Sequence, residues 1–145
     1  MGRPLMARLI NPGIGEVVDR LTILSLKILI GTEKGRDIQH FIRERDVLLT
    51  QVRARTLNGA WFESTLELSA VNGQLWQAED QMRAYREQYD RLPRAGVVGS
   101  VGPDHPVWVG VGQVAFRIQQ LNDRRAELIG VINTTAGDAG GLEKV

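Results

Sequence analysis

Residues 15–30, GEVVDRLTILSLKILI, are apolar around almost the whole circumference of the helix that they would form. Aliphatic side chains cover one broad side of that helix and much of the other. The charged residues are confined to a narrow strip of Glu16, Arg20 and Lys27, with Asp19 at its edge. A helix of this kind is expected at the centre of a helical bundle. The segment therefore predicts a central helix that carries charged groups into or beside the core.

Apolar residues recur at helical spacing in three further segments, which are bounded by Gly, by Asn-Gly or by Pro. Residues 92–113 separate the last two of these segments and are rich in Gly and Pro. We expect a loop there, with a short strand at VWVGV, because so many glycines disfavour a helix. The first helix is expected to start after Gly13 and to end at Gly31. The other expected helices span about 36–57, 60–91 and 114–133.

The chain of 145 residues is long enough for one domain with an apolar core and short for two. Hydrophobic residues make up 43% of it and charged residues 24%, which is typical of a globular protein. The pattern predicts an all-α fold, an antiparallel three- or four-helix bundle with long helices and a Gly-rich loop before the last one. We expect a single helical domain over residues 1–145, with 1–12 and 136–145 as flexible termini.

Composition argues against several classes of protein. The net charge of +1 gives no reason to expect a nucleic-acid partner. The absence of cysteine excludes disulfides and thiolate ligands, and two histidines are too few for most zinc sites, so we expect no metal and no cofactor. No apolar segment is long enough to span a bilayer, and the first residues lack the apolar block of a signal peptide. We therefore expect no membrane association and a cytoplasmic location.

Two arginines interrupt apolar seams. Arg45 occupies the middle of the seam of the second expected helix, and Arg125 that of the fourth. An isolated buried charge costs several kcal/mol, so both arginines need carboxylate partners if they are interior. The carboxylates nearest to core positions are Glu16, Asp19 and Glu79. The sequence predicts an interior network between these acids and the two arginines.

Asn72 and Asn122 are placed to satisfy the donors and acceptors that such a network leaves over, and Trp76 lies on the same helical stripe as Asn72. A second interpretation is that the arginine stems cover the core while their guanidinium groups reach water, and that the two acids of the first helix favour a helix N-terminus. Both interpretations are open at this point. The candidate ligand-binding residues are Glu16, Asp19, Arg45, Trp76, Glu79, Asn122 and Arg125.

Three segments, GEVVDRLTILSLK, LWQAEDQMR and LNDRRAELIGVIN, together resemble a family of short, all-helical bacterial proteins to which no activity is assigned. The shared patterns are GExxDRxTIL, LWxxED and NDxRA, and they cover about a third of the chain. The resemblance implies a helical fold and supplies no function. The Gly-rich loop before the last helix departs from the family, whose link there is shorter. The positions that the resemblance singles out are Gly15, Glu16, Asp19, Thr22, Lys27, Trp76, Glu79, Asp80, Asn122, Arg125 and Asn133.

Three classes of function fit these features. The first is a non-catalytic helical binding or assembly module of bacterial type, as a homodimer or as the partner of another protein. Coiled-coil-like seams favour it, as do Trp61 and Trp108 if they are exposed; each could equally fill a gap in the core.

The second class is a small-anion binder, such as a sugar-phosphate or phosphorylated-metabolite binding protein, or an enzyme acting on such a ligand. Arg45 and Arg125 would hold the anion by bidentate hydrogen bonds, and the Gly-rich loop with His105 and Trp108 would close over it. The loop lacks the Lys-Ser/Thr ending of a phosphate-binding loop, which favours the interpretation of a flexible connector.

The third class is a magnesium-dependent helical nucleotide hydrolase, whose E-x-x-E or E-x-x-D pairs place two oxygen ligands on one helix face. The chain has Glu16-x-x-Asp19 and Glu87-x-x-Asp90. The second pair lies among arginines on an expected solvated face, which favours chance occurrence. Whether the protein is an enzyme stays open.

Overall fold

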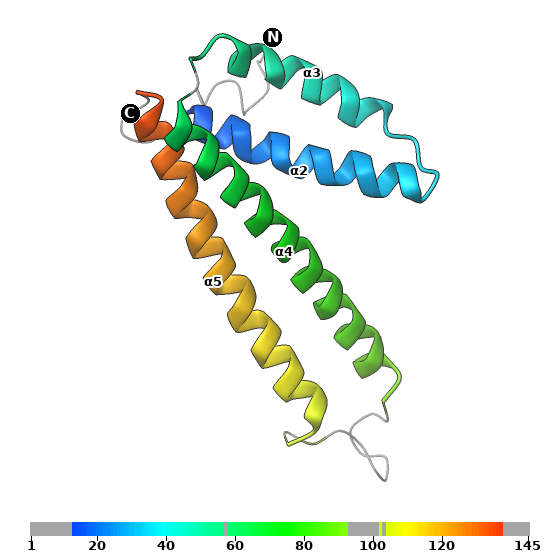
Figure 1. Ribbon diagram of the computed structural model, residues 1–145. Helices are drawn as coiled ribbons and strands as arrows, with labels where there is room; N and C mark the ends of the chain where they lie inside the picture. Colours follow the sequence, from blue (N-terminus) through cyan, green and yellow to red (C-terminus); the bar gives the residue numbers. More distant parts are fainter. Residues whose placement is uncertain (1–12, 57, 93–101, 103, 138–145) are drawn as a thin grey trace, which may run out of the picture. The chain divides into compact units, whose positions relative to one another are not determined.

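A computed structural model describes residues 13–56, 58–92, 102 and 104–137. Within these residues the chain forms four helices, seen in Figure 1, and no strand. The all-α prediction is confirmed. The expected termini 1–12 and most of 136–145 lie outside the described residues, as do positions 93–101 of the expected loop. The helices are α2 (Ile14–Glu33), α3 (Gln39–Arg53), α4 (Gly59–Asp90) and α5 (Pro106–Thr135).

The start of α5 differs from the expectation of a loop and a short strand before residue 114. Pro106 is the first helical residue, a position where its missing N–H is not needed. The backbone N–H of Val107 donates to Nδ1 of His105 at 3.1 Å, and Val107 is buried. The prediction of a loop with a strand at VWVGV is therefore wrong over 106–113, because capping and burial outweigh the poor helix propensity of Gly110 and Gly112.

The chain divides into two compact units, which are described separately. The first comprises Met1–Asn72 and Arg125–Val145, and the second comprises Gly73–Arg124. Both α4 and α5 contribute residues to each unit. Whether the two units make up the single domain that the sequence predicts stays a prediction.

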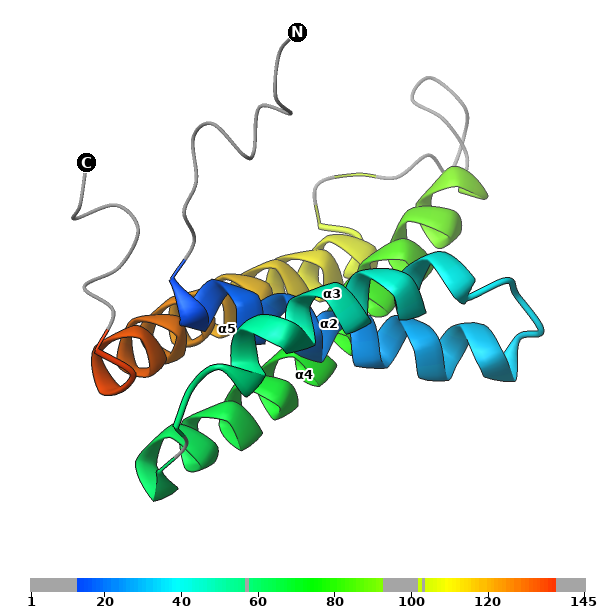
Figure 2. The ribbon, with the colours of Figure 1, turned by 90° about the horizontal axis from the view of Figure 1, so that it is seen from above.

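In the first unit, α2 and α3 form an antiparallel hairpin joined at residues 34–38 and lie side by side (Figures 1 and 2). Most of the buried residues of α2 lie in its first half, where the sequence predicts a central helix. Its second half is covered only in part: Leu26 and Ile30 are half-buried, and Leu29 is 58% exposed. No residue of α3 is buried. The side chains that are most completely buried in this unit are Ile14, Leu24, Leu68 and Ile132.

In the second unit, the later part of α4 and the earlier part of α5 form a helix pair. Its buried apolar residues are Leu75 and Ala78 from α4 and Val107 and Val114 from α5.

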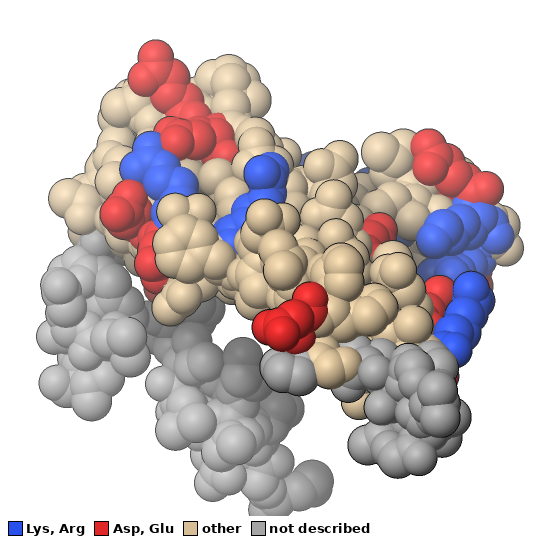
Figure 3. Space-filling model, turned by 90° about the horizontal axis from the view of Figure 1, so that it is seen from below, with Lys and Arg blue, Asp and Glu red and all other residues tan. Residues whose placement is uncertain are grey.

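On the face of the molecule drawn in Figure 3, basic side chains lie near acidic ones and no single sign of charge covers the surface. Of the helices in the described ranges, none combines the length and the apolarity needed to cross a bilayer.

Candidate functional site

Asp19 in the second turn of α2 is the centre of a buried polar cluster in the first unit. The Arg125 side chain from α5 donates to both carboxylate oxygens, from Nε to Oδ1 at 2.9 Å and from Nη2 to Oδ2 at 2.6 Å. The side chain of Asp19 is 9% exposed and that of Arg125 is 32% exposed. This two-point geometry is the strongest form of an arginine–carboxylate pair. The buried carboxylate is therefore compensated by a cation.

Asn72 from α4 completes this cluster. Its side-chain Nδ2 donates to Oδ1 of Asp19 at 2.9 Å and to Oγ1 of Thr22 at 2.7 Å. The Thr22 hydroxyl in turn donates to the backbone carbonyl of Asp19 at 2.8 Å. Asp19, Thr22 and Asn72 are all buried, so these bonds satisfy polar groups that water does not reach. The cluster joins α2, α4 and α5 within the first unit.

A second polar cluster lies at the start of α2. Gly13 precedes the helix and has no side chain with which to cap it. Instead Asn133 of α5 reaches across: its Oδ1 accepts the backbone N–H of Gly15 at 2.6 Å, and its Nδ2 donates to the carboxylate of Glu16 at 3.1 and 3.3 Å. The N–H groups of a first helical turn lack partners inside the helix. A residue 118 positions away in the chain supplies this one.

Gly15 is required by this close approach of α5. A Cβ atom at residue 15 would lie 2.4 Å from the backbone carbonyl oxygen of Ile129 and 2.9 Å from Oδ1 of Asn133, closer than such atoms approach in proteins. The glycine thus lets the backbone of α2 come near α5, and the cap depends on that approach.

Of the expected network between three acids and two arginines, the structure contains the pair of Asp19 and Arg125, and Asn72 donates to Asp19 as predicted. Glu16 accepts from Asn133 and is itself exposed. Arg45 departs from the prediction. It donates from Nε and Nη2 to its neighbour Asp46 at 3.1 and 3.0 Å.

The interior position predicted for Arg45 is wrong because α3, on which it lies, has no buried residue. The side chain of Arg45 is 36% exposed and its guanidinium group pairs with that of Asp46, which is 61% exposed, in agreement with the second interpretation of an arginine that reaches water.

Three candidate residues belong to the second unit: Trp76, Glu79 and Asn122. Glu79 and Asn122 are exposed, which corrects the expectation that they join an interior network. The helical positions beside the seam that they occupy lie at the surface of this two-helix unit. Trp76 is half-buried.

Arg20 of α2 and Glu44 of α3 form an ion pair that was not predicted from the sequence. Nε and Nη2 of Arg20 donate to the two oxygens of Glu44 at 2.6 and 2.9 Å, and each side chain is 40% exposed. The hydrogen bonds from Arg20 lower the pKa of Glu44 by more than burial raises it, and the same bonds raise the pKa of Arg20. The sequence does place a basic residue and an acidic residue on two neighbouring amphipathic helices. It does not show that these two residues meet, because that depends on the register of α2 against α3.

The structure does not favour Glu16 and Asp19 as the metal-binding acidic pair of a hydrolase. The carboxylate of Glu16 is turned to Asn133, and that of Asp19 to Arg125 and Asn72, so their oxygens do not converge on a common cation. Glu87 and Asp90 are exposed. Across the described part of the chain, no group of three or more His, Cys, Asp or Glu residues could hold a metal ion.

Six positions singled out by the family resemblance lie in the two polar clusters: Gly15, Glu16, Asp19, Thr22, Arg125 and Asn133. Comparison of the chain with protein-family models, with curated proteins and with solved structures finds no match. The resemblance therefore stays a prediction.

Proposed function

We propose that the protein is a non-catalytic helical binding and assembly module that forms a homodimer through the apolar surface of the α2–α3 hairpin. One observation carries this proposal: not one residue of α3, Gln39–Arg53, is buried, although the helix has an apolar seam that only Arg45 interrupts. An amphipathic helix normally buries its apolar stripe against the rest of the fold. The first unit covers this stripe only in part.

The incompletely covered surface includes both helices of the hairpin. In α3 the seam residues Phe41, Ile42, Leu48, Leu49 and Val52 are all half-buried. In α2 the side chains of Leu26 and Ile30 are half-buried and that of Leu29 is mostly exposed. We call these eight residues the hairpin surface. Burying the remaining apolar area would be favourable by about 25 cal/mol per Å².

The charges of α3 favour a second copy of this chain as the occupant. Arg43, Glu44, Arg45 and Asp46 give α3 side chains of both signs, of which Glu44 pairs with Arg20 and Arg45 with Asp46 within the chain. In a two-fold dimer the same surface of each copy meets its counterpart. A helix that carries both basic and acidic side chains can therefore pair its positive groups with the negative groups of the second copy, and the reverse. A partner whose surface carries mainly one sign of charge would not be electrostatically complementary to α3.

The buried cluster around Asp19 suits a structural role within such a module. Arg125 donates to both oxygens of the carboxylate and Asn72 to one of them, so these contacts hold Asp19 between helices of the first unit. Buried ion pairs add little net stability but can fix which helix faces meet. We infer that this cluster sets the register of α2 against α4 and α5.

The mass of the full chain in solution tests the proposal. At micromolar concentration, light scattering after size-exclusion chromatography is expected to give twice the 16.1 kDa of one chain. The test variant is L29E, which puts a charge on the hairpin surface at a residue that a monomer exposes. The matched control is V47E, because Val47 is 65% exposed and lies among polar residues of α3 outside the seam.

L29E is expected to weaken the dimer by about tenfold or more, since the interface would bury an unpaired carboxylate, whereas V47E leaves it unchanged. Circular dichroism of both variants checks that the helices are intact. A monomeric wild-type chain would refute the proposal, and so would equal effects of the two substitutions.

A further inference from the structure

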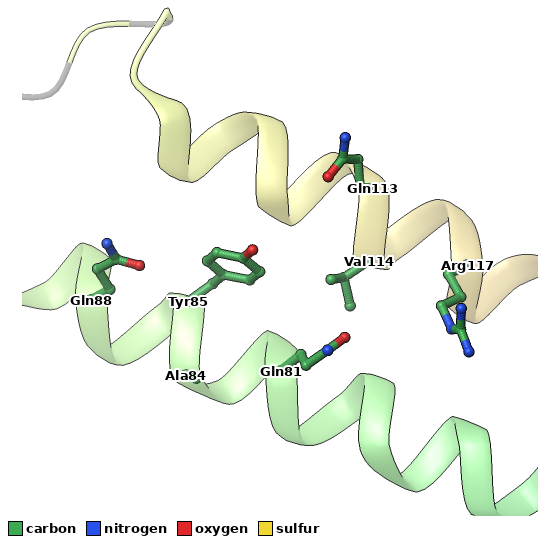
Figure 4. A pocket seen from close by; sticks show the side chains of 7 residues that line it. All are labelled: Gln81, Ala84, Tyr85, Gln88, Gln113, Val114 and Arg117. Carbon is green, nitrogen blue, oxygen red and sulfur yellow. The ribbon is translucent and has the colours of Figure 1, made fainter.

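The second unit contains an open pocket of about 470 Å³ between α4 and α5, drawn in Figure 4. Tyr85 of α4 extends towards α5, and Val114 of α5 extends towards α4, so that both side chains lie between the helices. The volume falls within the range of about 300–1,000 Å³ that is usual for small-molecule sites. Polar side chains complete the lining: Gln81 and Gln88 from α4, and Gln113 and Arg117 from α5.

The position of Tyr85 depends on Gly110. A Cβ atom at residue 110 would lie 2.5 Å from the hydroxyl oxygen of Tyr85, so any other residue there would push the ring away from α5. The glycine that makes the start of α5 look like a loop in the sequence thus provides room for an aromatic wall. This wall and the buried side chain of Val114 give the pocket a rigid apolar part.

The polar lining defines the chemistry of a ligand. Arg117 is the single charged residue among the described residues that line the pocket, and its planar guanidinium can bind a phosphate through two parallel hydrogen bonds. Each of the three glutamine amides can both donate and accept, which matches hydroxyl groups. The ring of Tyr85 and the side chain of Val114 offer an apolar surface to the C–H face of a sugar.

We propose that this pocket binds a small sugar phosphate, with the phosphate on Arg117 and the hydroxyl groups on Gln81, Gln88 and Gln113. The proposal does not rest on the dimer proposed above. It moves the anion site away from the two arginines that the sequence favoured. Arg125 is engaged by Asp19, and Arg45 donates to Asp46, whereas Arg117 lies at a pocket.

A neighbouring pocket of about 560 Å³ shares Tyr85 and supplies the control. Met82, Tyr89 and Trp108 give it apolar lining, and the charged residues Arg83, Arg86 and Asp90 line it as well. It lacks the glutamine amides of the first pocket. Arg86 and Arg117 are both exposed arginines of the second unit, so replacing either one removes the same charge from the same unit.

Calorimetric titration of the full chain with glucose 6-phosphate, glucose and inorganic phosphate tests the site. Glucose 6-phosphate is expected to bind at least about tenfold more tightly than either of the other two, because only it meets both the arginine and the amides. In nitrogen-edited NMR spectra, the side-chain amide signals of Gln81, Gln88 and Gln113 are expected to shift with saturation. Equal affinity for inorganic phosphate would overturn the assignment of a sugar. The absence of saturable shifts with all three probes would overturn the site.

Two substitutions locate the binding. R117Q is expected to weaken glucose 6-phosphate binding about tenfold or more, while R86Q leaves it unchanged. G110A is expected to weaken it as well, because Tyr85 must move out of the pocket; a melting curve of G110A checks that the helices persist. Equal losses in R117Q and R86Q would mean attraction by net charge alone and would overturn the proposal.

Discussion

Replacing Arg125 by methionine tests the buried cluster directly. Methionine has a similar length, so the substitution removes the guanidinium group and leaves most of the apolar stem. Asp19 then loses the donors to both oxygens and keeps Asn72 on Oδ1 alone. Breaking a fully buried ion pair on one side costs about 3–5 kcal/mol, because a charge is left unpaired in the interior.

The expected cost for R125M is lower, about 2–3 kcal/mol, for two reasons that the structure gives. The Arg125 side chain is 32% exposed, so water can enter where the guanidinium was, and Asn72 still donates to the carboxylate. Such a loss is a large part of the total stability of a small protein, which is about 5–15 kcal/mol. Urea unfolding followed by circular dichroism at neutral pH measures it.

Two further variants separate the lost pair from other effects. R45Q removes an arginine that also interrupts an apolar seam but is bonded to its exposed neighbour Asp46, so its stability should change by less than about 0.5 kcal/mol. The double variant D19L/R125M removes both charges and is expected to recover much of the loss. This account of the cluster would be refuted if R125M were no less stable than R45Q, or if D19L/R125M were no more stable than R125M.

The cap and the exposed ion pair give two more predictions. G15A is expected to lower the free energy of unfolding by about 1–3 kcal/mol, because the added methyl group collides with the backbone carbonyl of Ile129 and with the Asn133 cap. Thermal melting measures the loss against the control G59A, where no atom lies within 4 Å of the added methyl group. Because its pairing with Arg20 lowers the pKa of Glu44, that pair stabilises the fold above the ordinary glutamate pKa and the contribution is lost as pH falls through the lowered value. Since both side chains are 40% exposed, this pair should contribute about 0.5 kcal/mol to the free energy of unfolding. The corresponding loss on acidification should be absent in E44Q. Acid unfolding of E44Q that matches that of the wild type would contradict the prediction.

The sequence alone was sufficient for the all-α class and for three helices to within a few residues at most ends, because helical periodicity is a local property. It also predicted an interior network of Glu16, Asp19 and Glu79 with Arg45 and Arg125, of which the structure contains the pair of Asp19 and Arg125. A carboxylate on a strongly apolar helix and a cation in an apolar seam each need compensation wherever the helices pack.

Tertiary structure decided what depends on coverage and on distant neighbours. Arg45 and Arg125 both interrupt seams, yet only Arg125 pairs with a buried acid, because other helices cover its part of α5 while α3 stays at the surface. The cap on Gly15 joins residues 118 positions apart, and no local pattern indicates it. The first turns of α5 are helical despite their glycines, since packing on Tyr85 makes Gly110 an advantage there. Periodicity shows which face of a helix is apolar, but only the packed structure determines what covers that face.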